Sequence, residues 1–232
     1  MLSNQDNTCK VMEKHIVKVL STAFVTHNVK RFTLEKPAGY TFISGQATDV
    51  SINKPGLVDE LRPFTFTCLN SDDHLEFTIK IYKGHNGITE KLADINTGDE
   101  LILHEVFGAI NYQGTGLFVA GGAGLTPFIS ILRQLKADHK LAGNVLLFAN
   151  HTEDDIIIKD ELDGMLGKNH IDFIAEPLSG EKGRRIDKNV LQQYLSRETK
   201  YCYICGPDEF VSQMKTSLLE LGVTEDKIVI EQ

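Results

Sequence analysis

LFVAGGAGLTP, residues 117–127, is the stretch that decides the fold. It joins an apolar strand pattern at 117–120 to a helix pattern, in which apolar residues recur three and four positions apart at Phe128, Ile131 and Leu135. Glycines at such a turn let the backbone approach a phosphate closely, and the unpaired N–H groups of the helix start attract it. The segment predicts a site for a nucleotide pyrophosphate, with a tight turn that holds no ligand as the alternative.

The candidate nucleotide residues of this turn are Gly122, Gly124, Thr126 and Pro127. We expect Thr126 to cap the helix and Pro127 to be its first residue, where a missing N–H costs nothing. The pattern reads G-x-G-x-x-P, so Pro127 stands where the dinucleotide fingerprint has its third glycine. The turn therefore departs from a plain Rossmann match.

Strands and helices alternate through the rest of the second half. Apolar runs separated by amphipathic segments are typical of a parallel sheet with helices on both faces. After the strand at 117–120, the expected elements are a helix at 127–136, a strand at 145–150, a helix at 158–166, a strand at 170–175, a helix at 187–195, a strand at 201–205, a helix at 208–221 and a strand at 227–230.

The first half has short strands separated by turns. In LEFTIKIY (75–82) apolar and polar residues alternate, as in a strand with one buried face. Repeated short strands predict an antiparallel barrel or sandwich, and a polar, glycine-rich linker begins at Asn111. We predict a loose leader at 1–13, an antiparallel barrel at 14–111 and an α/β domain at 112–232. The expected barrel strands lie at 16–24, 29–35, 47–52, 62–69, 75–82 and 100–107.

The composition is that of an ordinary globular protein, with 41% hydrophobic residues among 232. Lys and Arg total 24 against 32 for Asp and Glu, and this net charge of −8 argues against a surface for nucleic acid or anionic membranes. No apolar run reaches the ~20 residues of a membrane span, and the polar first residues lack a signal-peptide pattern, so we expect a cytoplasmic protein. The His and Cys residues lack metal-ligand spacing, which predicts no metal and no iron–sulfur cluster.

A second motif, Cys205-Gly206-Pro207, ends one predicted strand and opens the last long helix. Ligands of an open parallel sheet bind beyond the carboxyl ends of its strands, so we expect Cys205 and Thr126 on the same edge. Cys202 and Cys205 lie three positions apart on a strand, and their sulfurs should point to opposite faces. A C-x-x-C redox or zinc site is therefore not expected.

Two motifs of the first half suit an anionic ligand that carries an aromatic ring. Within Arg62-Pro63-Phe64-Thr65, Arg62 and Phe64 share one face of a strand and offer a guanidinium for phosphate beside a ring for stacking. Gly87-Ile88-Thr89 lead into a short helix, a second helix start that can receive an anion. Each motif taken alone has a structural explanation, the first as a barrel strand and the second as a barrel crossover.

In order and spacing these four motifs resemble the ferredoxin-NADP reductase superfamily, particularly its bacterial flavodoxin and ferredoxin reductase branch. The match covers about residues 14–232. The resemblance implies a flavin-binding barrel and a nicotinamide-nucleotide domain with FAD between them, and NADH or NADPH as the hydride donor. It also implies an FAD-dependent NAD(P)H oxidoreductase that passes electrons to a separate flavodoxin, ferredoxin or oxygenase component.

The resemblance also implies roles for individual residues. Arg62 would pair with the FAD pyrophosphate, Phe64 would stack along the isoalloxazine in place of the family's Tyr, and Thr65 would hydrogen-bond flavin N5. Cys205 would lie beside the nicotinamide and Glu231 would match an acidic residue near the flavin, so Thr65, Cys205 and Glu231 are the expected catalytic residues. The positions that would contact the nucleotides are Arg62, Pro63, Phe64, Thr65, Gly87, Ile88, Thr89, Gly122, Gly124, Thr126, Pro127, Gly206 and Pro207.

Several alternatives stay open at this point. An NAD(P)H:free-flavin reductase and a non-catalytic flavin- or dinucleotide-binding electron-transfer subunit compete with the oxidoreductase. The acidic run at 153–155 favours NADH because carboxylates repel a 2′-phosphate, whereas the basic cluster at 182–185 could bind one. Because the two domains use almost the whole length, we expect an external electron acceptor, and we expect a monomer.

Overall fold

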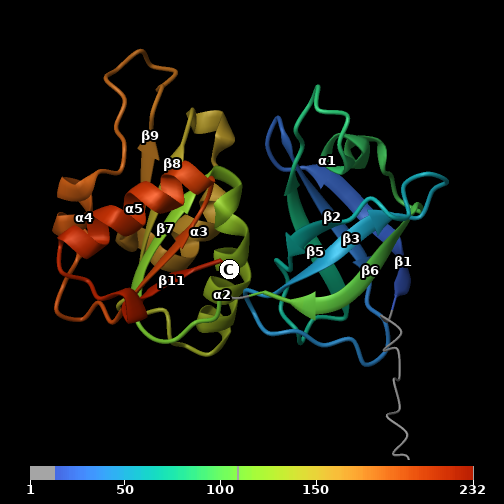
Figure 1. Cartoon of the computed structure of the whole chain (residues 1–232), viewed down its shortest axis with the longest axis horizontal. Coiled ribbons are helices and arrows are strands. Elements are labelled where there is room, and N and C mark those ends of the chain that lie inside the picture. Colours follow the sequence, from blue (N-terminus) through green and yellow to red (C-terminus); the bar gives the residue numbers. More distant parts are fainter. Residues whose placement is uncertain (1–13, 109, 232) are drawn as a thin grey trace, which may run out of the picture.

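The computed structural model describes residues 14–108 and 110–231, so the predicted leader at 1–13 lies outside the described residues. Two sheets divide the chain (Figure 1): a six-stranded one between His15 and Phe107 and a five-stranded one between Gly116 and Ile230. The first is antiparallel and the second parallel. The predicted fold class, an antiparallel barrel followed by an α/β domain, is confirmed. The predicted boundary at 111–112 falls in the connection between the sheets.

The first sheet is a nearly closed barrel with the strand order β4-β3-β6-β1-β2-β5. Its edge strands approach each other again where Phe66 bridges Phe77. The Phe66 ring also stacks on Phe42 at 4.2 Å inside the barrel core. The elements are β1 (His15–Phe24), β2 (Val29–Glu35), β3 (Ala47–Ile52), β4 (Arg62–Thr65), β5 (His74–Lys80), the helical turns α1 (Ile88–Lys91) and η1 (Leu92–Asp94), and β6 (Glu100–Phe107).

One barrel strand is shorter than the sequence predicted. The strand expected at 62–69 ends at Thr65. Beyond the bridge at Phe66, the Thr67 amide donates to the Glu76 carbonyl at 2.9 Å, and the Leu69 amide donates to the Asp72 carboxylate at 2.9 Å. These bonds turn the chain toward β5, and the turn ends the pairing with β3.

The second sheet has the strand order β11-β10-β7-β8-β9. Helices α2 and α3 pack on the face that carries Phe118 and Cys205, and helices α4 and α5 pack on the face that carries Val119 and Cys202. Both faces are therefore buried, as the apolar strand patterns predicted. The main elements are β7 (Gly116–Gly121), α2 (Thr126–Ala137), β8 (Val145–Asn150), α3 (Lys159–Leu166), β9 (His170–Ile174), α4 (Lys188–Tyr194), β10 (Tyr201–Cys205), α5 (Asp208–Glu220) and β11 (Ile228–Ile230).

The predicted cap of α2 is wrong in one detail. A 3-10 turn, η2 (Gly122–Leu125), precedes the helix, and Leu125 already has a helical backbone. Thr126 is therefore the first helical residue, and its hydroxyl donates to the Ala123 carbonyl at 3.0 Å instead of accepting from an amide. Pro127, expected to be the first helical residue, is the second, still within the first turn where its missing N–H breaks no helical bond.

His170, at the start of β9, is a buried histidine between two carboxylates. Its Nδ1 lies 2.6 Å from an oxygen of Asp163, and its Nε2 lies 3.1 Å from an oxygen of Asp172. Burial disfavours a charged ring, but the carboxylates of Asp172 and Asp163 outweigh burial and raise the pKa of His170 above its usual value of 6.5.

This raised pKa makes the stability of the second domain depend on pH. The ion pairs contribute fully below the unfolded-state pKa of His170, and their contribution is lost as the pH rises through the higher folded-state pKa. Between about pH 6 and about pH 8.5, the wild type should lose more melting temperature than His170→Gln, by a few degrees in calorimetry. Parallel pH profiles for the two proteins would contradict this assignment.

Candidate functional site

The two glycine motifs of the second domain meet at the carboxyl edge of the parallel sheet. Strand β10 pairs with β7, so that Cys205 lies opposite Ala120. A Cβ atom on Gly124 would lie 2.3 Å from the carbonyl oxygen of Cys205 and 2.5 Å from the amide nitrogen of Gly206. Only glycine permits this approach, which places the turn before α2 against the Cys205-Gly206-Pro207 loop.

Cys205 contacts Glu231 at this edge. The thiol donates to a Glu231 carboxylate oxygen at an Sγ–Oε2 distance of 3.7 Å. Burial, together with the Glu231 charge, raises the pKa of the Cys205 thiol to about 12. The side chain is therefore a thiol at neutral pH, able to fill space and donate a hydrogen bond but not to act as a thiolate nucleophile. Cys202 is buried on the opposite face of the sheet, as predicted.

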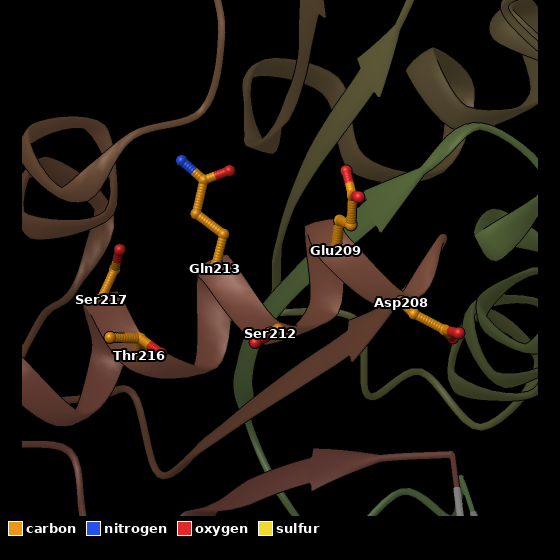
Figure 2. A pocket seen from close by; sticks show the side chains of 6 residues that line it. All are labelled: Asp208, Glu209, Ser212, Gln213, Thr216 and Ser217. Atoms are coloured by element: carbon orange, nitrogen blue, oxygen red, sulfur yellow. The ribbon is translucent and has the colours of Figure 1, made fainter.

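Two hollows border the first turns of α5. One of about 440 Å³ lies beside Cys205, Gly206 and Glu231. The other, of about 570 Å³, follows the solvent side of the helix and contains neither Cys205 nor Glu231. The hollow beside Cys205 is part of the candidate site, because Cys205 and Gly206 of the motif line it. Figure 2 shows the polar side chains that line the other hollow: Asp208, Glu209, Ser212, Gln213, Thr216 and Ser217.

On the barrel, contacts bring Arg62 into the same neighbourhood as α1. Glu60, two residues before Arg62, accepts from Lys91 of α1 at 2.9 and 3.0 Å. The Arg62 side chain is exposed and donates only to the Leu61 carbonyl at 2.7 Å, and within the described ranges no carboxylate pairs with it. The amides of Gly87-Ile88-Thr89 form the first turn of α1, where a helix leaves N–H groups without intrahelical acceptors. An unpaired guanidinium and free helix-start amides are both groups that suit a phosphate.

Phe64 and Thr65 form the other end of the same strand. Phe64 packs on the barrel core near Phe77, with ring centres 6.5 Å apart, and Thr65 pairs with Ala47 of β3. Gly45, two residues before Ala47, donates its amide to the Ser130 hydroxyl of α2 at 3.0 Å. The Thr65 end of β4 is therefore the end near the second domain, and Arg62 lies three residues, roughly 10 Å, away along the strand.

Comparison with known proteins identifies this arrangement. A family model for the oxidoreductase NAD-binding domain matches residues 118–216. NADH-cytochrome b5 reductase 1 of Kluyveromyces lactis is 30% identical over 230 residues, which cover 90% of this chain and 80% of that protein. The chain belongs to the ferredoxin-NADP reductase superfamily. It is an FAD-dependent NAD(P)H oxidoreductase, as the sequence predicted. Its curated relatives include NADH-cytochrome b5 reductases of Eremothecium gossypii and Rattus norvegicus, at 29% and 25% identity.

Solved structures share the superfamily's two-domain fold. The b5R-containing domains of human Ncb5or match with a TM-score of 0.81 at 23% identity, covering 97% of this chain and 71% of that chain. A ferredoxin NADP+ reductase from Neisseria gonorrhoeae, solved with bound FAD and NADP, matches with a TM-score of 0.78 at 21% identity, covering 94% of this chain and 97% of that chain. The barrel and the α/β domain described above therefore form a known architecture.

The charges at the two helix starts decide which of them suits the dinucleotide pyrophosphate. Asp208 and Glu209 occupy the first turn of α5, where their carboxylates already complement the positive end of the helix. The first turn of α2 carries no acidic residue. Gly122 before it has a φ of +52° and open space around its Cα. The pyrophosphate of the nicotinamide nucleotide therefore fits at α2, where Gly122, Gly124, Thr126 and Pro127 lie.

Asn150, the last residue of β8, is a further candidate residue that the sequence motifs did not include. Its side chain is buried, and neither amide atom has a hydrogen-bond partner among the described residues. Leaving such a group unpaired costs about 1–3 kcal/mol. Ala149 pairs with Gly121, so Asn150 lies next to the turn before α2. The amide fits a role in binding the nicotinamide nucleotide, and its only sequence signal was a polar residue that ends the apolar run VLLFAN.

Lys30 holds the helical segment that begins at Gly87-Ile88-Thr89. Its Nζ is buried and donates to the carbonyls of Ala93 at 2.7 Å and Ile95 at 2.6 Å, at the far end of that segment. Burial lowers the pKa of Lys30, although the charges of Asp94 and Asp99 oppose this shift. The lysine fixes the segment on the barrel, so the amides that suit the FAD pyrophosphate keep their position.

Within 14–108 and 110–231, no group of three or more His, Cys, Asp or Glu side chains is placed to hold a metal ion. In the same part of the chain, no helix has both the length and the apolar character needed to cross a membrane.

Asn150→Ala is expected to weaken NAD+ binding, because the substitution removes buried amide atoms that have no partner among the described residues and lie next to the turn before α2. The loss should be about 5- to 100-fold in Kd, measured by calorimetric titration of the FAD-loaded enzyme. Asn144→Ala is the matched control, since the Asn144 amide is buried and bonded to the Gly116 amide and the Leu141 carbonyl. The control should lower the melting temperature and leave the Kd unchanged. An N150A protein with lower stability and normal affinity would show that Asn150 is structural.

Arg62→Ala is expected to reduce FAD affinity, because the lost charge-assisted bonds are worth about 1.5–3 kcal/mol, or roughly 10- to 100-fold. The measurement is flavin content after desalting, followed by titration of the apoprotein with FAD. Arg197→Ala removes an exposed arginine from the second domain and should retain full flavin. Equal flavin content in both variants would argue against the pyrophosphate role of Arg62.

Proposed function

We propose that this chain oxidises NADH through a resident FAD and passes the electrons singly to a separate haem protein of the cytochrome b5 kind. The observation that carries the proposal is the similarity over most of the chain to NADH-cytochrome b5 reductases. Besides the Kluyveromyces lactis protein, an Arabidopsis thaliana NADH–cytochrome b5 reductase 1 is 31% identical over 230 residues. When bound, FAD takes up two electrons as hydride and releases them one at a time, which suits a one-electron haem acceptor.

The chain's own residues hold and orient the two nucleotides. Phosphate contacts fall to Arg62 and the α1 amides on one side and to the turn before α2 on the other. Thr65 lies at the end of β4 that is nearest the second domain. The Cys205–Glu231 pair lies at the carboxyl edge of the parallel sheet, where the nucleotide motifs meet. This division leaves the reacting rings between the domains, where orientation and exclusion of water make the main contribution to rate.

The preference for NADH rests on charge next to β8. Glu153 and Asp154 follow Asn150 closely and are exposed, so their carboxylates repel a 2′-phosphate in this turn. Asp155 is engaged in the turn itself, where it accepts from the amide and hydroxyl of Thr152 at 3.0 and 2.9 Å. In the basic cluster, the Arg184 guanidinium stacks over the Phe173 ring at 4.9 Å. The Arg184 guanidinium is thus engaged with a ring of β9, whereas the Glu153 and Asp154 carboxylates are exposed beside the end of β8.

An oxygenase component is the second candidate acceptor. The reductase component of propane 2-monooxygenase from Rhodococcus jostii is 30% identical over 216 residues, which cover 85% of this chain and 57% of that protein. A haem acceptor is favoured because the cytochrome b5 reductases match over 80% of their length. The monomeric state and the cytoplasmic location stay predictions.

The test compares nicotinamides and acceptors with the purified flavoprotein. We expect kcat/KM with NADH to exceed that with NADPH by at least about tenfold, and soluble cytochrome b5 to be reduced faster than flavodoxin or a ferredoxin. Faster reduction of a ferredoxin or an oxygenase component would contradict the haem acceptor. Loss of all flavin on desalting, with free FAD consumed as substrate, would instead identify a free-flavin reductase.

A further inference from the structure

Helix α2 makes several of the contacts between the two domains. It begins at the turn that suits the nicotinamide nucleotide, and Figure 1 shows it on the side of the second domain that faces the barrel. Ser130 and Arg133 lie three positions apart, hence on one face of the helix. Ser130 accepts from the Gly45 amide of the barrel at 3.0 Å. One face of α2 therefore carries several polar contacts between the domains, beside the approach of Asn28 and His27 of the barrel to Asp155 at 3.5 and 3.8 Å.

Arg133 bonds to both domains at once. Its Nη1 donates to the Thr67 carbonyl at 2.7 Å and to a Glu76 carboxylate oxygen at 2.8 Å, and both of these residues belong to the barrel. Its Nε and Nη2 donate to the two carboxylate oxygens of Glu161 in α3, at 2.6 and 2.9 Å. A planar, forked guanidinium bound on two edges has one allowed orientation, so these bonds fix direction as well as distance.

The barrel partner of Arg133 is itself held rigidly. The Glu76 side chain is mostly buried and also accepts from the Thr67 hydroxyl at 2.8 Å, while its second oxygen lies 3.9 Å from Nε of Arg31. A buried carboxylate is costly unless a cation and hydrogen bonds compensate it. If Arg133 moved away from Glu76, the buried carboxylate would lose its compensating cation at a cost in free energy. This cost keeps the two domains in contact.

The Arg133 contact lies between the two segments that are expected to hold the reacting rings. Thr67 lies two residues after Thr65, at the end of the motif where the flavin ring is expected. Thr126 lies seven residues before Arg133, about 10 Å along α2. Arg133 therefore links the strand that orients the flavin to the helix that carries the nicotinamide turn. Hydride transfer needs reacting atoms ~3–3.5 Å apart, and a misplacement of ~1 Å costs about a hundredfold in rate.

We propose that Arg133 is a positioning residue for hydride transfer, which sets the relative orientation of the flavin and nicotinamide domains through its bonds to Glu76 and Glu161. It contacts neither reacting ring. The proposal rests on the flavin-dependent oxidation of a nicotinamide and not on the identity of the acceptor. Its test therefore follows reduction of the flavin without an acceptor.

The first measurement is anaerobic stopped-flow bleaching of the flavin at saturating NADH. In Arg133→Met the limiting rate should fall about 10- to 100-fold, while the dissociation constants for FAD and NAD+ stay within about threefold of the wild type. Arg133→Lys keeps the charge but not the fork, and it should also be slow. Lys136→Met removes an exposed cation of the same helix and should behave as the wild type.

The second measurement is calorimetry of the apoproteins, which reports the contact between domains without any cofactor. The wild type should unfold in one transition, because Arg133 couples the domains, and R133M should unfold in two. If R133M does not fold, Glu161→Gln replaces it, since this change weakens one edge of the fork and leaves Glu76 paired.

Three results would overturn the proposal. A normal limiting rate in R133M, whatever its melting temperature, would make Arg133 merely structural. A rate that falls only in parallel with loss of FAD or NAD+ binding would make it a binding residue. A single, unchanged calorimetric transition in the R133M apoprotein would show that the arginine does not couple the domains.

Discussion

The structure depends on one guanidinium between two carboxylates. Arg133 compensates the buried charge of Glu76 in the barrel and holds Glu161 in the second domain, in the bidentate geometry that arginine favours. Each domain has its own apolar core, and the cluster around α2 also includes Val29 of barrel strand β2, so apolar packing and the Arg133 bonds both join the domains. A reaction between two bound rings needs a fixed orientation of the domains, so the contact through α2 connects the fold to the chemistry.

The charged groups near the two helix starts and on the barrel differ in sign, and the sign indicates which of them can bind phosphate. Arg62 on the barrel and the acid-free start of α2 suit phosphates, whereas Asp208 and Glu209 occupy the start of α5. Arg62 lies at the end of β4 away from the domain contact, and Thr65 lies toward it. Binding energy from the phosphates can therefore position the rings without any charged group of those sites taking part in hydride transfer.

The sequence predicted what depends on local pattern. The turn at Gly122–Pro127 and the Cys205-Gly206-Pro207 loop each join a strand to a helix, and both stand at the expected edge because that geometry is decided within a few residues. The strand boundaries near Thr65 and the cap at Thr126 were wrong by a few residues. Hydrogen bonds to the next strand and a 3-10 turn overrode the local preference there.

The sequence did not predict residues whose partners are distant in the chain. Lys30 belongs to no motif of the sequence, and its acceptors lie 63 and 65 residues away. Arg133 belongs to none either, and its barrel partners lie 57 and 66 residues away. Asn150 differs, because its candidacy rests on a buried amide that has no partner among the described residues.

A crystal structure with FAD and NAD+ bound tests the central claim most directly. The account predicts nicotinamide C4 within about 3–3.5 Å of flavin N5, with Arg133 still bonded to Glu76 and Glu161. Rings in that geometry with Arg133 released from Glu76, or rings held apart with every Arg133 bond intact, would contradict it.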